Sequence, residues 1–311
     1  MLGDCCIEVL LATFNGERYL PAFLTSLAQQ RHANWILRAR DDGSNDRTLA
    51  ILADFARQFP DRVNIDRTMK QGSRGACQNF ATLLRNSTGN YIALADQDDV
   101  WLPGKLADSL ALLRQAEQHA PGIPMLVHSD LTVVDEQLGP LCESFWKYQG
   151  LRPTPEALSF QRLLVENCLT GCTMLMNREL VDRVGTIPPS AIMHDWWIAL
   201  VASAFGQIHT IGTPTVLYRQ HAGNTIGAQP LHLRRMASLL RTMRQSVARK
   251  QGQAEQFHRQ FADCSPTFAP DEAAAFYRLA SLPPLIRQVA AMSRRYRMSG
   301  FLKTIGLYCA L

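Results

Sequence analysis

The sequence lacks an uninterrupted apolar run of the length that a bilayer span requires. Its longest stretch without a charged residue, 196–218, is long enough for such a span. That stretch is broken by residues that are polar or that disrupt helices: Gly206, Gln207, His209, Gly212 and Pro214. We therefore expect a helix followed by strands here, not a membrane-spanning helix.

The sequence also lacks the marks of export and of a disulfide framework. Asp4 and Glu8 occupy positions where a signal peptide has its basic and apolar regions, so we expect no signal peptide. The 8 cysteines include no CxxC pair, and Cys168 and Cys172 lie in a run that otherwise has the composition of a core. We expect reduced thiols in a cytoplasmic protein, and no structural zinc.

Charge is scarce and unevenly distributed. Charged residues make up 19% of the 311 residues and apolar residues 47%, which allows one large core or two modest ones. Residues 231–311 hold 13 Lys and Arg against 4 Asp and Glu, whereas the other residues hold 19 against 23. The basic C-terminal region is therefore expected to face an anionic partner. Aromatic residues do not alternate with its arginines, which argues against nucleic acid as that partner.

Short apolar runs alternate with segments of helical periodicity in the first hundred residues. We expect strands at 7–13, 36–39, 63–65 and 91–95, and helices at 17–30, about 46–58 and 74–85. This alternation predicts βαβ units, so the expected class is α/β with a mostly parallel central sheet flanked by helices. Further along we expect a helix at 105–119, strands at 125–128 and 173–176, and a helical region from about residue 231 onward.

Asp96, Asp98 and Asp99 lie directly after an expected strand, where ligands of parallel sheets bind. Three carboxylates in four residues should not lie in a core, because their repulsion and desolvation would cost several kcal/mol unless a cation neutralised them. Oxygen ligands on a short loop suit Mg²⁺ or Mn²⁺. The alternative is a solvated acidic turn that caps a helix starting near Pro103, and the residues alone leave both interpretations open.

Three further segments carry polar side chains of interest. Residues 41–46 have turn chemistry in which Asp46 can cap the next helix, but this leaves Asp41 and Asp42 without a structural reason. Asp195 precedes two tryptophans, and it is either a partly desolvated proton acceptor or a helix cap. His221 follows Tyr218-Arg219-Gln220 and is either a ligand or a structural hydrogen-bonding residue.

Taken in order, these segments resemble the family 2 inverting nucleotide-sugar glycosyltransferases of the GT-A fold. The resemblance covers about residues 7–225 and rests on four motifs: Ala12-Thr13-Phe14-Asn15-Gly16-Glu17, Asp41-Asp42-Gly43-Ser44-Asn45-Asp46, Asp96-Gln97-Asp98-Asp99-Val100-Trp101 and His194-Asp195-Trp196. The third motif and the Tyr-Arg-Gln-His segment look most like the bacterial rhamnosyltransferase-like branch. Ala12 departs from the proline of many members, and the Gln-x-x-Arg-Trp motif of processive synthases is absent.

The resemblance implies a role for each matching residue. The implied donor-binding residues are Thr13 and Asp42 at the base, Asn15 and Glu17 near base and ribose, Gly72 and Asn79 in a segment approaching the donor, and Asp96 at the ribose. Mg²⁺ or Mn²⁺ would be held by Asp96 and Asp98, and His221 would complete the metal site or contact a phosphate. Asp195 would be the general base that deprotonates the acceptor hydroxyl.

The resemblance also implies an organisation and an activity. Residues 1–228 would form the GT-A domain, with a nucleotide-binding half at about 1–100 and an acceptor half at about 101–228, and 229–311 would form a basic helical region. The implied reaction moves one sugar from dTDP-rhamnose or a UDP-sugar to a glycan or lipid-linked acceptor in surface polysaccharide synthesis. The basic region could hold the enzyme peripherally on the inner face of the cytoplasmic membrane. The alternative is a non-catalytic nucleotide- or sugar-binding module on the same fold.

Overall fold

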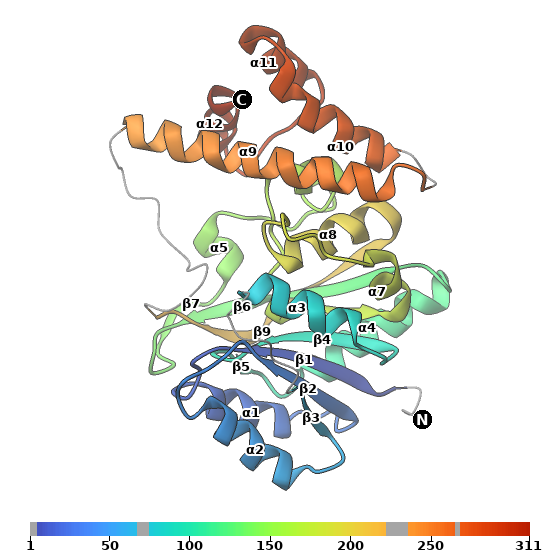
Figure 1. Ribbon diagram of the computed structural model, residues 1–311, viewed down its shortest axis with the longest axis vertical. Coiled ribbons are helices and arrows are strands. Elements are labelled where there is room, and N and C mark those ends of the chain that lie inside the picture. Colours follow the sequence, from blue (N-terminus) through green and yellow to red (C-terminus); the bar gives the residue numbers. More distant parts are fainter. Residues whose placement is uncertain (1–4, 67–74, 222–235, 265–267) are drawn as a thin grey trace. The chain divides into compact units, whose positions relative to one another are not determined.

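The computed structural model describes residues 5–66, 75–221, 236–264 and 268–311, and side chains of the last helical region from residue 242 onward. These residues form two compact units (Figure 1). The first comprises the described residues of Met1–Phe145, Leu169–Ile187 and Gly206–Gly227, and the second those of Trp146–Cys168, Pro188–Phe205 and Ala228–Leu311. The division into a 1–228 domain and a 229–311 region stays a prediction.

The first unit is built on one sheet with the strand order β3-β2-β1-β4-β8-β6-β9-β5, and β7 pairs with β6. Its N-terminal half is parallel and contains β1 (Ile7–Thr13), β2 (Trp35–Asp41), β3 (Val63–Asp66) and β4 (Tyr91–Asp96). The strand β1 is buried on both faces, as expected for a central parallel strand. The strand β2 extends beyond its expected run at both ends, and at its C-terminal end Arg40 pairs with Asp66 of the neighbouring strand at 3.4 Å.

Three helices connect these strands: α1 (Leu20–Ala28), α2 (Thr48–Gln58) and α3 (Ala76–Arg85). Figure 1 shows α1 and α2 on one face of the sheet and α3 on the other, as right-handed crossovers require for this strand order. The helix α1 begins later than the periodicity predicts. Pro21 favours a helix start at this point, and Glu17 lies in the preceding turn, where it accepts a hydrogen bond from the Arg47 N–H at 3.0 Å.

The C-terminal half of the sheet mixes parallel and antiparallel pairs. Its strands are β5 (Val100–Trp101), β6 (Met125–Val134), β7 (Pro140–Cys142), β8 (Leu175–Asn177) and β9 (Gln207–Arg219), with helices α4 (Lys105–His119), η1 (Gly171–Thr173) and α7 (Arg178–Val184). The expectation of several strands after residue 206 is wrong, because 207–219 form one strand. Its register against β6 shifts beside Asp130, so that the strand continues past Pro214.

The second unit is helical. Its elements are α5 (Phe145–Gln149), which begins at the boundary, α6 (Phe160–Val165), α8 (His194–Phe205), α9 (Met236–Phe261), α10 (Phe268–Arg278), η2 (Leu279–Ser281), α11 (Pro284–Ser293) and α12 (Phe301–Ala310). Trp197 of α8 and Phe257 of α9 are fully buried, with ring centroids 5.8 Å apart. Among the described residues, none of these helices combines the length and apolar character needed to cross a bilayer.

Candidate active site

The loops that follow β1, β2 and β4 meet at one edge of the sheet. Thr13 at the end of β1 is in register with Asp41 at the end of β2, and Ala12 is in register with Asp96 at the end of β4. Because the three strands are parallel, their carboxyl ends present neighbouring loops. The three N-terminal motifs therefore lie side by side, as the sequence predicts.

Asp98 and His221 are in direct contact at this edge. The Nε2 atom of His221 lies 2.8 Å from Oδ2 of Asp98, although the residues are 123 positions apart. The antiparallel pairing of Val100 in β5 with Leu217 in β9 brings the two segments together. Both side chains keep some exposure, 12% for His221 and 20% for Asp98, so this pair is accessible to a ligand.

Arg219 supports this pair from the end of β9. Its side chain is buried, its Nε donates to the backbone carbonyl of Asp98 at 2.9 Å, and its guanidinium also donates to the carbonyl of Glu136. The guanidinium carbon lies 4.8 Å from the ring centroid of Tyr19, and the Tyr19 ring in turn lies 4.6 Å from the His221 ring. Arg219 thus connects the acidic loop, β9 and the imidazole.

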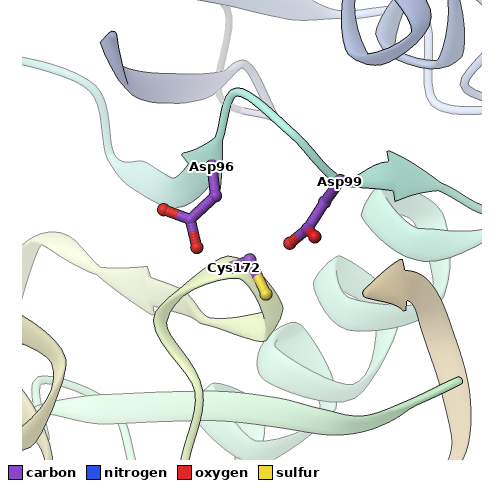
Figure 2. A group of neighbouring side chains, drawn as sticks. All are labelled: Asp96, Asp99 and Cys172. Atoms are coloured by element: carbon purple, nitrogen blue, oxygen red, sulfur yellow. The ribbon is translucent and has the colours of Figure 1, made fainter. Parts of the chain in front are cut away.

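A second group of side chains lies at the same loop. Ligand atoms of Asp96, Asp99 and Cys172 all lie within 4.8 Å of one another, and Figure 2 shows both carboxylates extending from the β4–β5 loop toward the thiol. Asp99 is fully buried, and its Oδ1 accepts the N–H of Arg219 at 3.2 Å. The expectation that none of the three carboxylates lies in a core is therefore wrong for Asp99.

The protonation state of Asp99 explains how its carboxyl can be buried. Desolvation, together with the charges of Asp98 and Asp96, raises the pKa of the Asp99 carboxyl well above its ordinary range, which favours the neutral form. Burial and the two nearby carboxylates, Asp99 and Asp96, also raise the pKa of the Cys172 thiol, which favours its neutral form.

A buried cation lies beside this group. Lys105 is fully buried, and its Nζ lies 4.1 Å from the ring centroid of Trp101. Burial lowers the pKa of Lys105 to about 8, against the opposing influence of Cys172 and Asp99. The neutral form of the Asp99 carboxyl accounts for its burial, and the charge of Lys105 adds an attraction between the two residues.

The acidic loop is not a helix cap. The helix α4 begins at Lys105 with Gly104 as its N-cap residue, and no side chain caps it. The expected capping of the helix by residues 96–99 is therefore wrong, although residues 97–98 do form a turn. The carboxylate oxygen of Asp98 and the imidazole nitrogen of His221 are donor atoms of kinds that bind divalent cations. Ligand atoms of Asp96 group with Asp99 and Cys172, so that a metal shared by Asp96, Asp98 and His221 stays a prediction.

Thr13, Asn15 and Glu17 make hydrogen bonds to the loop that follows β2. Thr13 Oγ1 donates to Oδ1 of Asp41 at 2.9 Å, and Oδ1 of Asn15 accepts the Asn45 N–H at 3.0 Å. The expectation that Asp46 is the N-cap residue of α2 is wrong by one position, because Arg47 is the N-cap residue; Asp46 accepts the Thr48 N–H at 2.9 Å. These contacts join the first two loops into one surface.

Asp42 and Asn79 are both buried and hydrogen-bonded within the protein. Asp42 is buried, and its Oδ2 accepts the Gly75 N–H at 2.8 Å. The Asn79 amide is also buried and binds Arg40 twice, accepting from its guanidinium at 2.9 Å and donating to its carbonyl at 3.0 Å. Gly72 lies outside the described residues. The donor contacts expected of these residues stay predictions.

Asp195 lies in the first turn of α8, in the second unit. It is half-buried, and its Oδ1 accepts the Trp196 N–H at 2.6 Å. Trp196 Nε1 donates to the Leu163 carbonyl at 2.6 Å, and this bond anchors the start of the helix on α6. The role of Asp195 as general base stays a prediction.

Gln97, Lys105 and Cys172 were not predicted from the sequence to be parts of the site, and Arg219 was predicted only as a basic group that could contact a diphosphate. Gln97 makes two hydrogen bonds to the backbone of Phe14, at 3.0 and 2.9 Å, and a Cβ atom on Gly16 would lie 2.2 Å from its Oε1. Gln97 lies within the Asp96–Trp101 motif and Arg219 directly before the Gln220-His221 pair, so both positions were close to residues that the sequence had already marked. Lys105 and Cys172 reach the loop from other segments, and no local pattern marks them.

The comparisons with known proteins identify the family. A model of "Glycosyl transferase family 2" matches residues 8–185. The dTDP-rhamnosyl transferase RfbG of Shigella flexneri is 25% identical over 231 residues, which cover 70% of this chain and 74% of RfbG. The glucosyltransferase WfgD of Escherichia coli is 24% identical over 183 residues, which cover 58% of this chain and 64% of WfgD, less than two thirds of its length.

Two solved structures share the fold. TarS residues 1–349 of S. aureus, in complex with UDP-GlcNAc, superimposes with a TM-score of 0.56 at 15% identity and covers 98% of this chain and 90% of TarS 1–349. The mannosyltransferase PcManGT of Pyrobaculum calidifontis, in complex with GDP-Man and Mn²⁺, gives 0.53 at 19% identity, with 97% and 84% covered. The predicted α/β fold is confirmed. With the family model matching more than half of the sequence, the chain belongs to glycosyl transferase family 2.

Proposed function

We propose that this glycosyltransferase moves a single sugar, with inversion of configuration, from a nucleoside diphosphate donor to a hydroxyl of a glycan or lipid-linked acceptor. The observation that carries the proposal is the 2.8 Å contact of Asp98 with His221 at the carboxyl edge of the parallel strands. A carboxylate and an imidazole at this position suit a divalent cation and the diphosphate that it binds.

The proposed donor is dTDP-rhamnose or a UDP-sugar, and the proposed pathway is surface polysaccharide synthesis. The names of the relatives support this choice, because RfbG is a dTDP-rhamnosyl transferase and WfgD uses UDP-Glc on a diphosphoundecaprenol acceptor. The proposed donor-binding residues are Thr13, Asn15, Glu17, Asp42, Gly72, Asn79 and Asp96.

Asp96, Asp98 and His221 would hold Mg²⁺ or Mn²⁺. When bound, the cation stabilises the negative charge that develops on the leaving nucleoside diphosphate. Arg219 donates to the backbone carbonyl of Asp98 at 2.9 Å and so supports the residue whose carboxylate contacts His221. Mn²⁺ in the PcManGT complex supports a cation in this fold.

Asp195 would accept the proton of the acceptor hydroxyl. As that proton leaves, the hydroxyl oxygen forms a bond to the anomeric carbon from the face opposite the nucleotide, and the bond from that carbon to the diphosphate oxygen breaks. Asp195 is half-buried beside Trp196, whose N–H it accepts at 2.6 Å, and a carboxylate in this setting can act as a proton acceptor. The enzyme would work in the cytoplasm, with peripheral membrane contact through residues 229–311.

The test is thermal stabilisation by a panel of nucleoside diphosphates and nucleotide-sugars, each with and without Mn²⁺. We expect a Mn²⁺-dependent rise in Tm with dTDP or UDP that is lost in Asp98→Asn. It should persist in the control Asp182→Asn, whose carboxylate on α7 is 68% exposed. No rise with any nucleotide would contradict the proposal. A rise with nucleotide but no donor turnover with any glycan acceptor would favour the non-catalytic binding module.

A further inference from the structure

Two helices at the C-terminal end of the second unit expose large apolar side chains. In α11, Leu285 is 73% exposed and Val289 59%, and in α12, Phe301 is 79% exposed and Leu302 82%. Ile286 and Met292 of α11 and Ile305 of α12 are also exposed. We call these seven side chains the apolar surface. Clusters of this kind mark interaction sites, whereas single exposed apolar residues are ordinary.

The apolar residues of each helix lie on one face. Positions 285, 289 and 292 of α11 recur at the spacing of a helical stripe, and positions 301 and 305 of α12 are separated by four residues. The opposite faces are packed, because Ala291 and Leu307 are buried. Arg287 adds to this packing by donating to the carbonyls of Ala280 at 3.0 Å and Leu282 at 2.8 Å, and to that of Leu311. The exposed faces thus belong to folded helices.

Basic residues predominate along the segment that carries the apolar residues, although Glu166 pairs with Lys303 of α12 at 3.6 Å. Residues 273–311 contain six Lys and Arg and no Asp or Glu. Arg295 and Arg297, between the two helices, are exposed, whereas Arg294 forms an ion pair with Glu272 at 3.0 Å. A second copy of the chain on this surface would bring like charges together, whereas anionic phosphates would neutralise them.

We propose that α11 and α12 form a docking surface for an anionic lipid bilayer. The seven apolar side chains enter the boundary between headgroups and acyl chains, and Arg295 and Arg297 contact lipid phosphates. Amphipathic helices with basic flanks lie on a bilayer in this way without crossing it. This inference builds on the proposed function, because it would bring the enzyme to the surface where a lipid-linked acceptor resides.

The test is sedimentation of the full chain with vesicles of phosphatidylcholine, with and without phosphatidylglycerol. We expect binding to the anionic vesicles, weakened by high salt, and a drop of about tenfold or more in affinity for the triple variant Leu285→Ser, Phe301→Ser, Leu302→Ser. The matched control is Leu141→Ser, an apolar residue of β7 that is 56% exposed. Arg295→Gln with Arg297→Gln should weaken binding to anionic vesicles alone.

Three results would overturn the proposal: no vesicle binding at low salt, equal binding to neutral vesicles, or unchanged binding by the triple variant. A concentration-dependent dimer that the triple variant abolishes, without vesicle binding, would instead assign the surface to a second copy. The nucleotide-dependent rise in Tm separates this inference from the proposed function. It should be unchanged in the triple variant, which also shows that the variant is folded.

Discussion

His221 Nε2 lies 2.8 Å from Asp98 Oδ2, which joins the end of β9 to the acidic loop after β4. We predict that His221→Ala lowers the affinity for nucleoside diphosphate in the presence of Mn²⁺ by about tenfold or more, because a ligand position is lost. Affinity without metal should change little. Titration calorimetry with and without Mn²⁺ measures both. The control is His119→Ala, which removes an exposed histidine of α4. Equal effects of the two variants on nucleotide affinity would count against a role of the Asp98–His221 pair in metal binding.

Asp99 is expected to act as a neutral hydrogen-bonding group. Because burial raises the pKa of its carboxyl, Asp99→Asn should preserve the bond to the Arg219 N–H and cost about 1 kcal/mol or less in free energy of unfolding. Asp99→Ala leaves a cavity and an unpaired N–H, and should cost about 3 kcal/mol. Urea unfolding compares the two. If the asparagine variant is as unstable as the alanine variant, the ionised form of Asp99 is the native one.

Replacement of Arg219 by lysine should destabilise the protein. A lysine cannot donate to the carbonyls of Asp98 and Glu136 in the same planar geometry, so Arg219→Lys should destabilise the chain by about 2 kcal/mol. It should also weaken Mn²⁺-dependent nucleotide binding several-fold, since the Asp98 loop loses a support. Arg183→Lys on α7 is the control substitution. Loss of stability with unchanged nucleotide affinity would limit Arg219 to a structural role.

Two buried histidines should make the protein sensitive to acid. Burial lowers the pKa of His128 and of His194 to about 3, below the value of about 6.5 in the unfolded chain. Between these values the unfolded state binds more protons, so the free energy of unfolding should fall as the pH falls from 6.5 toward 3. From pH 7 to pH 5 each histidine should contribute a loss of about 2 kcal/mol.

The substitution His128→Gln tests this account, because glutamine can keep the 2.9 Å contact with Thr210 without titrating. Urea unfolding at pH 7 and pH 5 should show a smaller difference in the variant by about 2 kcal/mol. His119→Gln should keep the full difference. An unchanged pH dependence in His128→Gln would mean that His128 is not neutral and buried in the native state.

Local patterns were enough to predict the elements of the parallel half-sheet. The strand at 7–13 and the helix at 105–119 are confirmed to the residue, because apolar periodicity and nearby turn residues agree there. The boundaries of β2 could not be predicted from the apolar run. The arginines of β2 pair with Glu8 and Asp66 on neighbouring strands. The apolar periodicity of a single segment carries no information about such pairs between strands.

The site also has features that the sequence could predict and features that it could not. The clustering of three loops at one sheet edge follows from the parallel strand order, so residues 13–17, 41–46 and 96–99 could be brought together from the sequence. The burial of Asp99 could not be predicted, because its surroundings include Cys172 from η1 and the Arg219 N–H from β9, which are distant in the sequence. The support of Asp98 by Arg219 likewise requires the antiparallel pairing of β5 with β9.

The most direct test of the metal assignment is electron paramagnetic resonance of Mn²⁺ with the nucleoside diphosphate that stabilises the protein most. We predict that the wild-type chain binds Mn²⁺ together with the nucleotide, that Asp98→Asn abolishes this binding, and that Asp182→Asn leaves it intact. Equal Mn²⁺ binding by Asp98→Asn and the wild type would contradict the account, because the cation would then be held without the carboxylate that contacts His221.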